Sequence, residues 1–456
     1  METVIPFRAW RYAPSAGELS QVVAPPYDVI DPELRSRLYA RSRHNIVRVD
    51  LGMTTPSDNE CDNQYTRASD QLALWKESDI LVRDTEPSIT FVEESFTGPD
   101  GRLRIRHGFL ALMRLFGLDE GVVFPHEQTF SGPKEDRYRL LDATSMCLSP
   151  VFLLYDLPGD EITSTWKNGP GTQTPAASVI DEEGTVTKLW PTSDPDLLEA
   201  AGRNLTAARF IIADGHHRYE TALRYKKQRL LETKVGQDEQ AFDYVLAYFS
   251  NMSDPGLAIY GTHRLISGLD PEVLTALPQS LANAFAVEPL ADGNVGAPTA
   301  RAAIAAYLRD RPRGAFGLWG PGLDGVYGLR LGDPEAARAA APGHSAAYQL
   351  LDVTVLSTLI LEKTLGIAPG DRVAAGDPAG RRDMTAEAHV TFFKDPDDAF
   401  ARLEAGEFQV GFFLNPTGLD QIREVALGGE RMPQKATYFY PKLPTGLVFH
   451  DLSGHI

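Results

Sequence analysis

One segment constrains the fold more than any other part of the chain. An apolar run, Phe210–Ala213, leads into Asp214 and Gly215, and a helical pattern from Arg218 to Leu230 follows at once. The apolar run predicts a buried strand, and the glycine permits a sharp turn before the helix. Because strands that feed directly into helices are typical of α/β folds, we predict a mixed α/β (α+β) chain with mixed sheets and flanking helices.

The same junction has the chemistry of an anion site. Backbone N–H groups at the start of a helix lack intrahelical partners, and the helix dipole is positive there. Gly215 lets the backbone approach a ligand closely, while His216, His217 and Arg218 add side-chain donors. Together these residues suit a phosphate group. The structural alternative is that Asp214 caps the helix and the histidines are ordinary surface or core residues.

A metal site is not expected at this turn. Adjacent side chains rarely chelate one ion, and no further ligands stand at a known spacing. A dinucleotide fingerprint is also not expected, although Gly320–Gly325 (GPGLDG) has its spelling. The residues after it alternate like a strand instead of opening a helix, so we predict a hairpin turn.

Two further segments carry candidate catalytic groups. His126 and Glu127 could perform acid–base chemistry, and Lys134 and Arg137, shortly after them, could neutralise phosphate oxygens. The alternative is a polar loop followed by a helix with ordinary surface charges. Asp28 follows two rigid prolines inside an apolar stretch and could be a general base or a magnesium ligand. It could equally cap the helix expected near position 32.

Candidate substrate-binding residues come from two later segments. His263 and Arg264 form another histidine–arginine pair, and Met432–Lys442 places two lysines, Lys435 among them, between aromatic residues that include Tyr438. Such mixtures can bind phosphate and a small polar substrate. Both segments could also be structural parts of a rim.

Charge and composition exclude several classes of protein. The chain of 456 residues has 44 basic and 62 acidic residues, a formal net charge of −18. A field of this sign repels polyanions, so we expect neither nucleic acid nor an anionic membrane as a partner. Two cysteines cannot build a disulfide framework, no apolar run reaches the roughly 18 residues that span a bilayer, and no secretory signal is visible. We expect a cytoplasmic protein.

The organisation along the chain is mixed and without repeats. We predict an N-terminal α/β region (1–155), a central region with the Asp-Gly-His-His-Arg turn (179–290) and a C-terminal α/β region (291–456), all forming one interwoven catalytic unit. Locally, Ile46–Leu51 alternates at period two and predicts a strand. Trp166–Ser178 has the composition of a surface loop.

The motifs resemble a known family. The runs APPYDVI, FPHEQTF, IADGHHRYETAL, NMSDPGL and MPQKATYFYPK occur in this order and resemble the bacterial and archaeal family known as domain of unknown function 1015. This resemblance spans about Pro6 to Val448, and the family's name implies no activity. The Asp-Gly-His-His-Arg turn is also similar to that of ParB/sulfiredoxin-like proteins that act as free-serine kinases, which implies a ParB/sulfiredoxin-like element around it.

The second resemblance implies roles for individual residues. In that superfamily the helix start grips nucleotide phosphates, and an N-terminal acidic residue activates the substrate hydroxyl. Carried over, Gly215 to Arg218 would cradle phosphate and Asp28 would be the base. The Pro-Pro-Tyr before Asp28 departs from the kinases' pattern, and this chain is far longer than those kinases.

The resulting hypothesis is a phosphotransferase that moves a phosphoryl group between a nucleotide, ATP or ADP with Mg²⁺, and a small hydroxyl compound, with free serine favoured. The expected catalytic residues are Asp28, His126, Glu127, His217 and Arg218. The expected nucleotide-binding residues are Asp214, Gly215, His216, His217, Arg218, Lys134 and Arg137, and the expected substrate-binding residues are His263, Arg264, Lys435 and Tyr438. A phosphate-ester hydrolase using the same pocket and a non-catalytic nucleotide sensor are alternatives, and a homodimer is left open.

Overall fold

A computed structural model of the chain describes residues 2–98, 100–129, 131–232, 239–293, 295–367, 372–373 and 389–456. These residues pack into two compact units, each assembled from separate stretches of sequence. Unit 1 comprises 1–125, 129–258 and 441–456, and unit 2 comprises 126–128 and 259–440. The prediction that regions 1–155, 179–290 and 291–456 form one catalytic unit remains a prediction.

Unit 1 is built on a nine-stranded mixed sheet with the order β6-β11-β8-β12-β5-β4-β10-β9, in which β1 also pairs with β5. Strand β11 is parallel to β6 and antiparallel to β8, so the sheet is mixed as the sequence predicts. The strands are β1 (Val4–Ile5), β4 (Ile89–Thr97), β5 (Leu103–Arg114), β6 (Val123–Pro125), β8 (Val151–Tyr155), β9 (Ala177–Ile180), β10 (Val186–Thr192), β11 (Phe210–Asp214) and β12 (Tyr244–Asn251).

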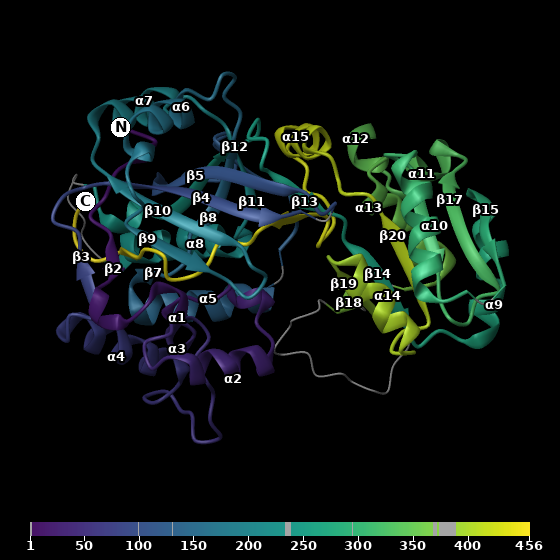
Figure 1. The fold of residues 1–456 in the computed structure, drawn as a ribbon, viewed down its shortest axis with the longest axis horizontal. Coiled ribbons are helices and arrows are strands. Elements are labelled where there is room, and N and C mark those ends of the chain that lie inside the picture. Colours follow the sequence, from purple (N-terminus) through teal and green to yellow (C-terminus); the bar gives the residue numbers. More distant parts are fainter. Residues whose placement is uncertain are drawn as a thin grey trace. The chain divides into compact units, whose positions relative to one another are not determined.

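Helices flank this sheet. In Figure 1, α6 and α7 lie on one side of it, and α5 and α8 lie on the other. The N-terminal helices pack around an apolar core that includes Leu38, Trp75 and Leu140. The helices of unit 1 are α1 (Leu19–Val22), α2 (Pro32–Arg41), α3 (Val47–Asp50), α4 (Gln64–Glu77), α5 (Ser131–Thr144), α6 (Glu161–Asn168), α7 (Pro195–Leu205) and α8 (His216–Glu232). Short pairs join β2 (Trp10–Tyr12) to β3 (Leu81–Arg83) and β7 (Met146–Cys147) to β22 (His450–Asp451).

Unit 2 has a sheet of its own, with the order β15-β17-β16-β20-β14-β19-β18. Its strands are β14 (His263–Ser267), β15 (Phe285–Asp292), β16 (Ala315–Trp319), β17 (Gly325–Leu331), β18 (Arg372–Val373), β19 (His389–Phe393) and β20 (Val410–Leu414). A two-stranded ribbon joins β13 (Ala258–Tyr260) and β21 (Tyr438–Tyr440). The helices are α9 (Pro271–Leu281), α10 (Ala297–Arg309), α11 (Pro334–Ala340), α12 (Ala346–Gln349), α13 (Asp352–Val355), a π-helix (Leu356–Thr364), α14 (Pro396–Glu404) and α15 (Leu419–Leu427).

Several local predictions are confirmed. The GPGLDG stretch connects the antiparallel strands β16 and β17 as a hairpin, and β11 leads into α8 as the apolar run and the glycine predict. Among the residues that the structure describes, no helix combines the length and apolarity that crossing a bilayer requires.

The strand predicted over Ile46–Leu51 is wrong. Residues Val47–Asp50 form the short helix α3, and the Asn45 side chain accepts a hydrogen bond from the N–H of Val47 at 3.0 Å. Bonds from Val49 and Asp50 to the carbonyl of Ile46 close the turn. The alternating pattern misleads here because this helix is buried, so that Val47, Val49 and Asp50 all lie inside.

The loop predicted over Trp166–Ser178 is wrong at both ends. Trp166 belongs to α6 and is buried, and its ring stacks on Phe91 of β4 with 4.1 Å between ring centroids. Residues from Ala177 onward enter β9. The Gly- and Pro-rich composition marks only the short connection between these two elements.

Candidate functional site

The Asp-Gly-His-His-Arg turn lies where β11 ends and α8 begins. Gly215 has φ +86°, a left-handed conformation that L-residues with a side chain rarely adopt. A β-carbon at this position would also lie 2.9 Å from Nε of Arg218. The left-handed turn therefore favours glycine, and a β-carbon here would also displace the Arg218 guanidinium.

Asp214 pairs with two cations at this turn. Its carboxylate accepts from the guanidinium of Arg218 and from the ammonium of Lys442, and all three side chains are about 15% exposed. Arg218 also donates to Oγ of Ser149 at 3.0 Å and to the carbonyl of Pro150. Burial alone would raise the pKa of Asp214, but Lys442 and Arg218 outweigh it and hold that pKa below its usual value. Asp214 therefore stays ionised.

Asp28 lies close enough to Lys442 to affect its protonation. Burial lowers the pKa of Lys442, but the charges of Asp214 and Asp28 outweigh burial and raise it. Asp28 sits in a 3-10 helix, Tyr27–Val29, directly after Pro26. Among the residues that the structure describes, its carboxylate has no hydrogen-bond or ion-pair partner. The structure therefore brings the predicted base to the predicted phosphate turn.

Arg137 belongs to the same cluster. It is 7% exposed, donates to Oδ1 of Asp50 at 2.9 Å and to Asp136 at 2.6 Å, and lies 4.2 Å from the ring centroid of Tyr27. The pKa of Tyr27 is raised by burial first, and it also responds to the charges of Asp28, Arg137, Arg218 and Asp214. These side chains therefore form one electrostatic cluster in unit 1.

The cluster has more acidic than basic side chains. Its carboxylates outnumber its cations by one, and the groups are Asp28, Asp50, Asp136 and Asp214 against Arg137, Arg218 and Lys442. A phosphate dianion bound here would need further positive charge beyond these side chains. The helix N-terminus of α8 and a divalent cation are the two sources that such sites commonly use.

The remaining predicted residues of unit 1 lie on α8 and α5. His216 and His217 open α8 and are partly exposed, and the charge of His216 contributes to the low pKa of Asp214. Lys134 lies near the start of α5 and pairs with Glu220, which also accepts from Oγ1 of Thr129 at 3.0 Å. Lys134 thus contacts the helix that carries the turn.

His126 and Glu127 belong to unit 2, where they contact the C-terminal segment. His126 is fully buried, and its Nε2 lies 2.8 Å from Oγ1 of Thr437. Glu127 accepts from the backbone N–H of Lys435 at 2.8 Å. Lys435 has φ +54°, a conformation that is uncommon for a residue other than glycine, and the bond that its N–H donates to Glu127 helps to fix it.

His263 and Arg264 lie in β14 of the unit 2 sheet, and Arg264 also contacts the C-terminal segment at Lys435. Arg264 is 2% exposed and donates to Oγ1 of Thr262 at 2.6 Å and to the carbonyl of Lys435 at 3.3 Å. His263 is buried beside Phe413, and burial lowers its pKa to about 3, so its ring is neutral. The ammonium of Lys394 lies over the ring of Tyr438, 5.1 Å from the centroid of that ring.

The predicted site residues therefore fall into two groups, one in each unit. Unit 1 brings together Asp28, Arg137 and the turn from Asp214 to Arg218, whereas unit 2 holds His126, Glu127, His263, Arg264, Lys435 and Tyr438.

Comparison with known proteins agrees with the motif resemblance. The family described as "Protein of unknown function (DUF1015)" matches residues 4–347. The chain belongs to this family. The search of curated proteins found no match to this chain.

Solved structures show only weak likeness to this DUF1015 protein. A mutant free serine kinase in complex with AMP has 14% identity and a TM-score of 0.37, covering 75% of this chain and 91% of that one. A conserved hypothetical protein from Pyrococcus furiosus has 14% identity and a TM-score of 0.33, covering 74% and 95%. SbnI with a C-terminal truncation, from Staphylococcus aureus, has 11% identity and a TM-score of 0.27, covering 76% and 84%. Likeness at this level carries no functional argument.

Sequence reasoning missed Lys442 and Asp50 of the DUF1015 chain. The segment Met432–Lys442 places two lysines among aromatics. The sequence-based prediction names Lys435, but Lys442 is the lysine that contacts Asp214. Asp50 was missed because it lies in α3, where the sequence pattern predicted a strand.

A larger cavity of about 560 Å³ lies near the opposite end of β11, beside Arg209. Its basic lining residues Arg114 and Lys226 already pair with Glu239 and Asp243. Its carboxylate Glu120, beside Gly121, already accepts from the backbone N–H of Gly117, whereas Asp28 has no such partner among the described residues, so we place the candidate site at the Asp-Gly-His-His-Arg turn.

One carboxylate near the turn, Asp28, fits a magnesium ion. The described part of the chain holds no group of three or more His, Cys, Asp or Glu residues suited to a metal. Magnesium in phosphoryl-transfer sites takes only one or two protein carboxylates and fills its other positions with phosphates and waters. Asp28 is a carboxylate of this kind, whereas both oxygens of Asp214 already pair with Lys442 and Arg218.

Proposed function

We propose that this protein is a phosphotransferase that moves a phosphoryl group between a nucleotide and a small hydroxyl compound, with free serine as the favoured acceptor. The observation that carries the proposal is the position of Lys442. It contacts Asp214 at the phosphate-type turn and lies within electrostatic reach of Asp28, whose carboxylate has no bonded partner among the described residues.

The chemistry assigns each group a task. Asp28 accepts the proton of the acceptor hydroxyl as its oxygen forms a bond to the terminal phosphorus of ATP or ADP. The bond from that phosphorus to the bridging oxygen breaks, and its electron pair leaves with the nucleotide. The N–H groups at the start of α8, with His217, Arg218 and Lys442, stabilise the charge on the transferring group.

Magnesium has a defined place in this proposal. The nucleotide phosphates and Asp28 would hold it, because both oxygens of Asp214 pair with Lys442 and Arg218, and when bound it would supply the positive charge that the acidic cluster lacks for a polyphosphate. Gly215 keeps the backbone of the turn open, and Arg218 is fixed by Ser149 and Asp214 so that it does not reorganise during the reaction.

The test is an assay of phosphoryl transfer. The full chain is incubated with Mg²⁺, ATP or ADP, and a panel of hydroxy amino acids, and phosphorylated products are detected by phosphorus NMR. Asp28→Asn should lower the rate by roughly 10²- to 10⁴-fold, the range for loss of a general base. Asp31→Asn is a matched control, because Asp31 caps α2 three residues later in the chain.

Other outcomes would point to other functions. Release of free phosphate without a nucleotide would favour a phosphate-ester hydrolase, and tight nucleotide binding without turnover would favour a sensor. A normal rate in Asp28→Asn with a reduced rate in Asp31→Asn would remove Asp28 from the mechanism.

A further inference from the structure

A small cavity in unit 1 contains two buried polar atoms without partners. Oδ2 of Asp50 and Oγ1 of Thr221 have no hydrogen-bond partner among the described residues, and the two residues are 5% and 4% exposed. Both line a cavity of about 50 Å³ between α3, α5 and α8. Its other polar lining residues are Tyr27, Arg137, Ser149 and Arg218.

A buried carboxylate oxygen without a donor is unusual enough to require an explanation. Leaving a buried charged acceptor unsatisfied is more costly than leaving a neutral one, so such atoms normally meet a protein group, water or a ligand. Arg137 satisfies only Oδ1 of Asp50. The cavity is several times larger than the roughly 10–15 Å³ that a single water requires, so a group of a few heavy atoms fits in it.

The charged groups that line the cavity are Asp50, Arg137 and Arg218, but Arg218 is paired with Asp214, and the wider cluster is acidic. The cluster that contains Asp50 has four carboxylates and three cations, and Asp136 shares Arg137 with Asp50. An added ammonium would balance this excess and could donate to both orphan oxygens.

The position of the cavity connects it to the proposed chemistry. Tyr27, at one wall, precedes the proposed base Asp28, and Arg218, at another, belongs to the phosphate-type turn. A small molecule seated there would therefore contact Arg218 of the turn and Tyr27, the residue before Asp28.

We infer that this cavity binds the ammonium group of a small ligand, with Oδ2 of Asp50 as the charged acceptor and Oγ1 of Thr221 as the second partner. The inference rests on the proposed function in one respect: the ligand is then the phosphoryl acceptor, an amino alcohol or hydroxy amino acid. Asp50 is the residue that selects acceptors with an ammonium group over those without one.

Calorimetric titration tests the inference without using turnover. L-Serine and L-glycerate differ in whether an ammonium or a hydroxyl stands on the second carbon, so wild type should bind serine more tightly. Asp50→Asn should weaken serine binding by roughly 10- to 100-fold, and Thr221→Val by roughly 3- to 10-fold, with little change for glycerate. Asp84→Asn is the matched control, because Asp84 pairs with Arg11 in the same unit.

Three outcomes would overturn the inference: glycerate binding as tightly as serine, no serine binding by wild type at millimolar concentrations, or unchanged serine affinity in Asp50→Asn. If Asp50→Asn fails to fold, as a shifted melting curve would reveal, unchanged affinity in Thr221→Val overturns it instead. Asp50-dependent serine binding without phosphoryl transfer would remove only the proposed function. Transfer that is equally fast to glycerate and independent of Asp50 would remove only this inference.

Discussion

Lys442 and Asp214 are 228 residues apart in sequence, yet the ammonium of one contacts the carboxylate of the other inside unit 1. This ion pair attaches the C-terminal segment to the turn that opens α8. Asp214 also holds Arg218, so one carboxylate positions both cations of the candidate site.

We expect Lys442→Met to destabilise unit 1 by about 3–5 kcal/mol, because it leaves Asp214 buried with one partner fewer. Asp214→Asn combined with Lys442→Met should recover part of that loss, since no unpaired charge then remains. Chemical unfolding measures both. Lys435→Met, in the same segment but in unit 2, should leave the unfolding of unit 1 unchanged. If the double variant were no more stable than Lys442→Met, the ion pair would not be the cause.

A second buried pair lies in the sheet. Arg106 donates to Oε2 of Glu94 at 2.8 Å and to the carbonyl of Pro441 at 2.8 Å, and both side chains of the pair are fully buried. Arg106→Met should cost about 3–5 kcal/mol, because Glu94 loses its compensating charge. Arg104, two residues earlier on β5, pairs with Asp100 near the surface, so Arg104→Met should cost no more than about 1 kcal/mol. Equal losses in the two variants would contradict this contrast.

Much of the fold could be predicted from local patterns. The apolar run at Phe210, the glycine at 215 and the helix after it required only short-range regularities, and the hairpin at Gly320–Gly325 was recognised from the strand after it. Asp50 could not be found in this way. In a strand with period two it would share the polar face with Arg48, whereas the single turn of α3 directs it inward with Val47.

The partners of the candidate site were harder to predict than its turn. Asp28, Arg137 and Arg218 carry chemistry that the sequence displays, but their mutual approach depends on long-range packing. Lys435 and Lys442 illustrate the limit of prediction from local sequence. Both are lysines among aromatics, and only the folded structure shows which of them contacts Asp214. One contacts Asp214, and the other has its backbone fixed by Glu127 and Thr262.

The stability of unit 2 should fall in mild acid because of His263. Burial lowers its folded pKa to about 3, well below the usual value of 6.5, so the unfolded state binds the proton first. Stability is therefore complete above pH 6.5 and is lost as the pH falls toward 3, by about 1.4 kcal/mol for the first unit below 6.5. Unfolding curves between pH 7 and 5 should show this slope in wild type and a reduced slope in His263→Gln. His344→Gln, at an exposed site in the same unit, should retain the slope.

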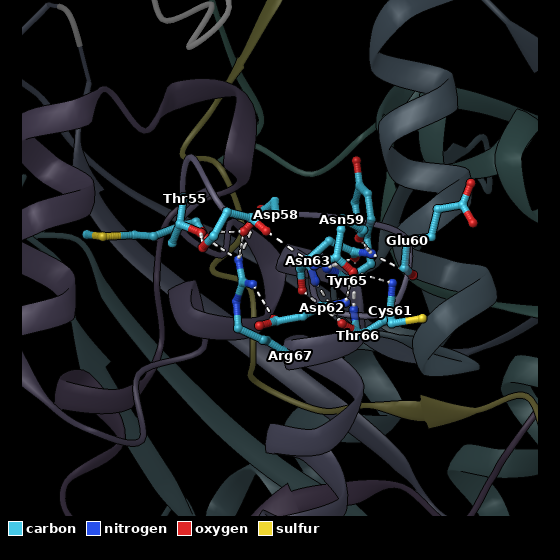
Figure 2. Close-up of polar contacts among 12 residues, drawn as sticks. Thr55, Asp58, Asn59, Glu60, Cys61, Asp62, Asn63, Tyr65, Thr66 and Arg67 are labelled. Carbon is cyan, nitrogen blue, oxygen red and sulfur yellow. Dashed lines mark hydrogen bonds and ion pairs between the residues drawn. The ribbon is translucent and has the colours of Figure 1, made fainter.

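The N-terminus of α4 provides a test of local structure that is independent of the site. Figure 2 shows the Asn63 side chain, whose oxygen accepts from the N–H groups of Tyr65 and Thr66 at 3.0 and 3.2 Å. The Thr66 hydroxyl in turn accepts from the N–H of Asn63, completing a capping box. Asn63→Ala should cost about 1 kcal/mol, since it leaves helix-start donors without this partner.

Glu60 is the control for this cap, because it lies in the same exposed loop and no side-chain contact of it is found among the described residues. Glu60→Ala should change stability by no more than about 0.5 kcal/mol. Hydrogen exchange at Tyr65 and Thr66 would locate the effect, because only the loss of the cap should speed exchange at these two amides. Faster exchange in Glu60→Ala, or none in Asn63→Ala, would show that the loop rather than the cap stabilises the helix start.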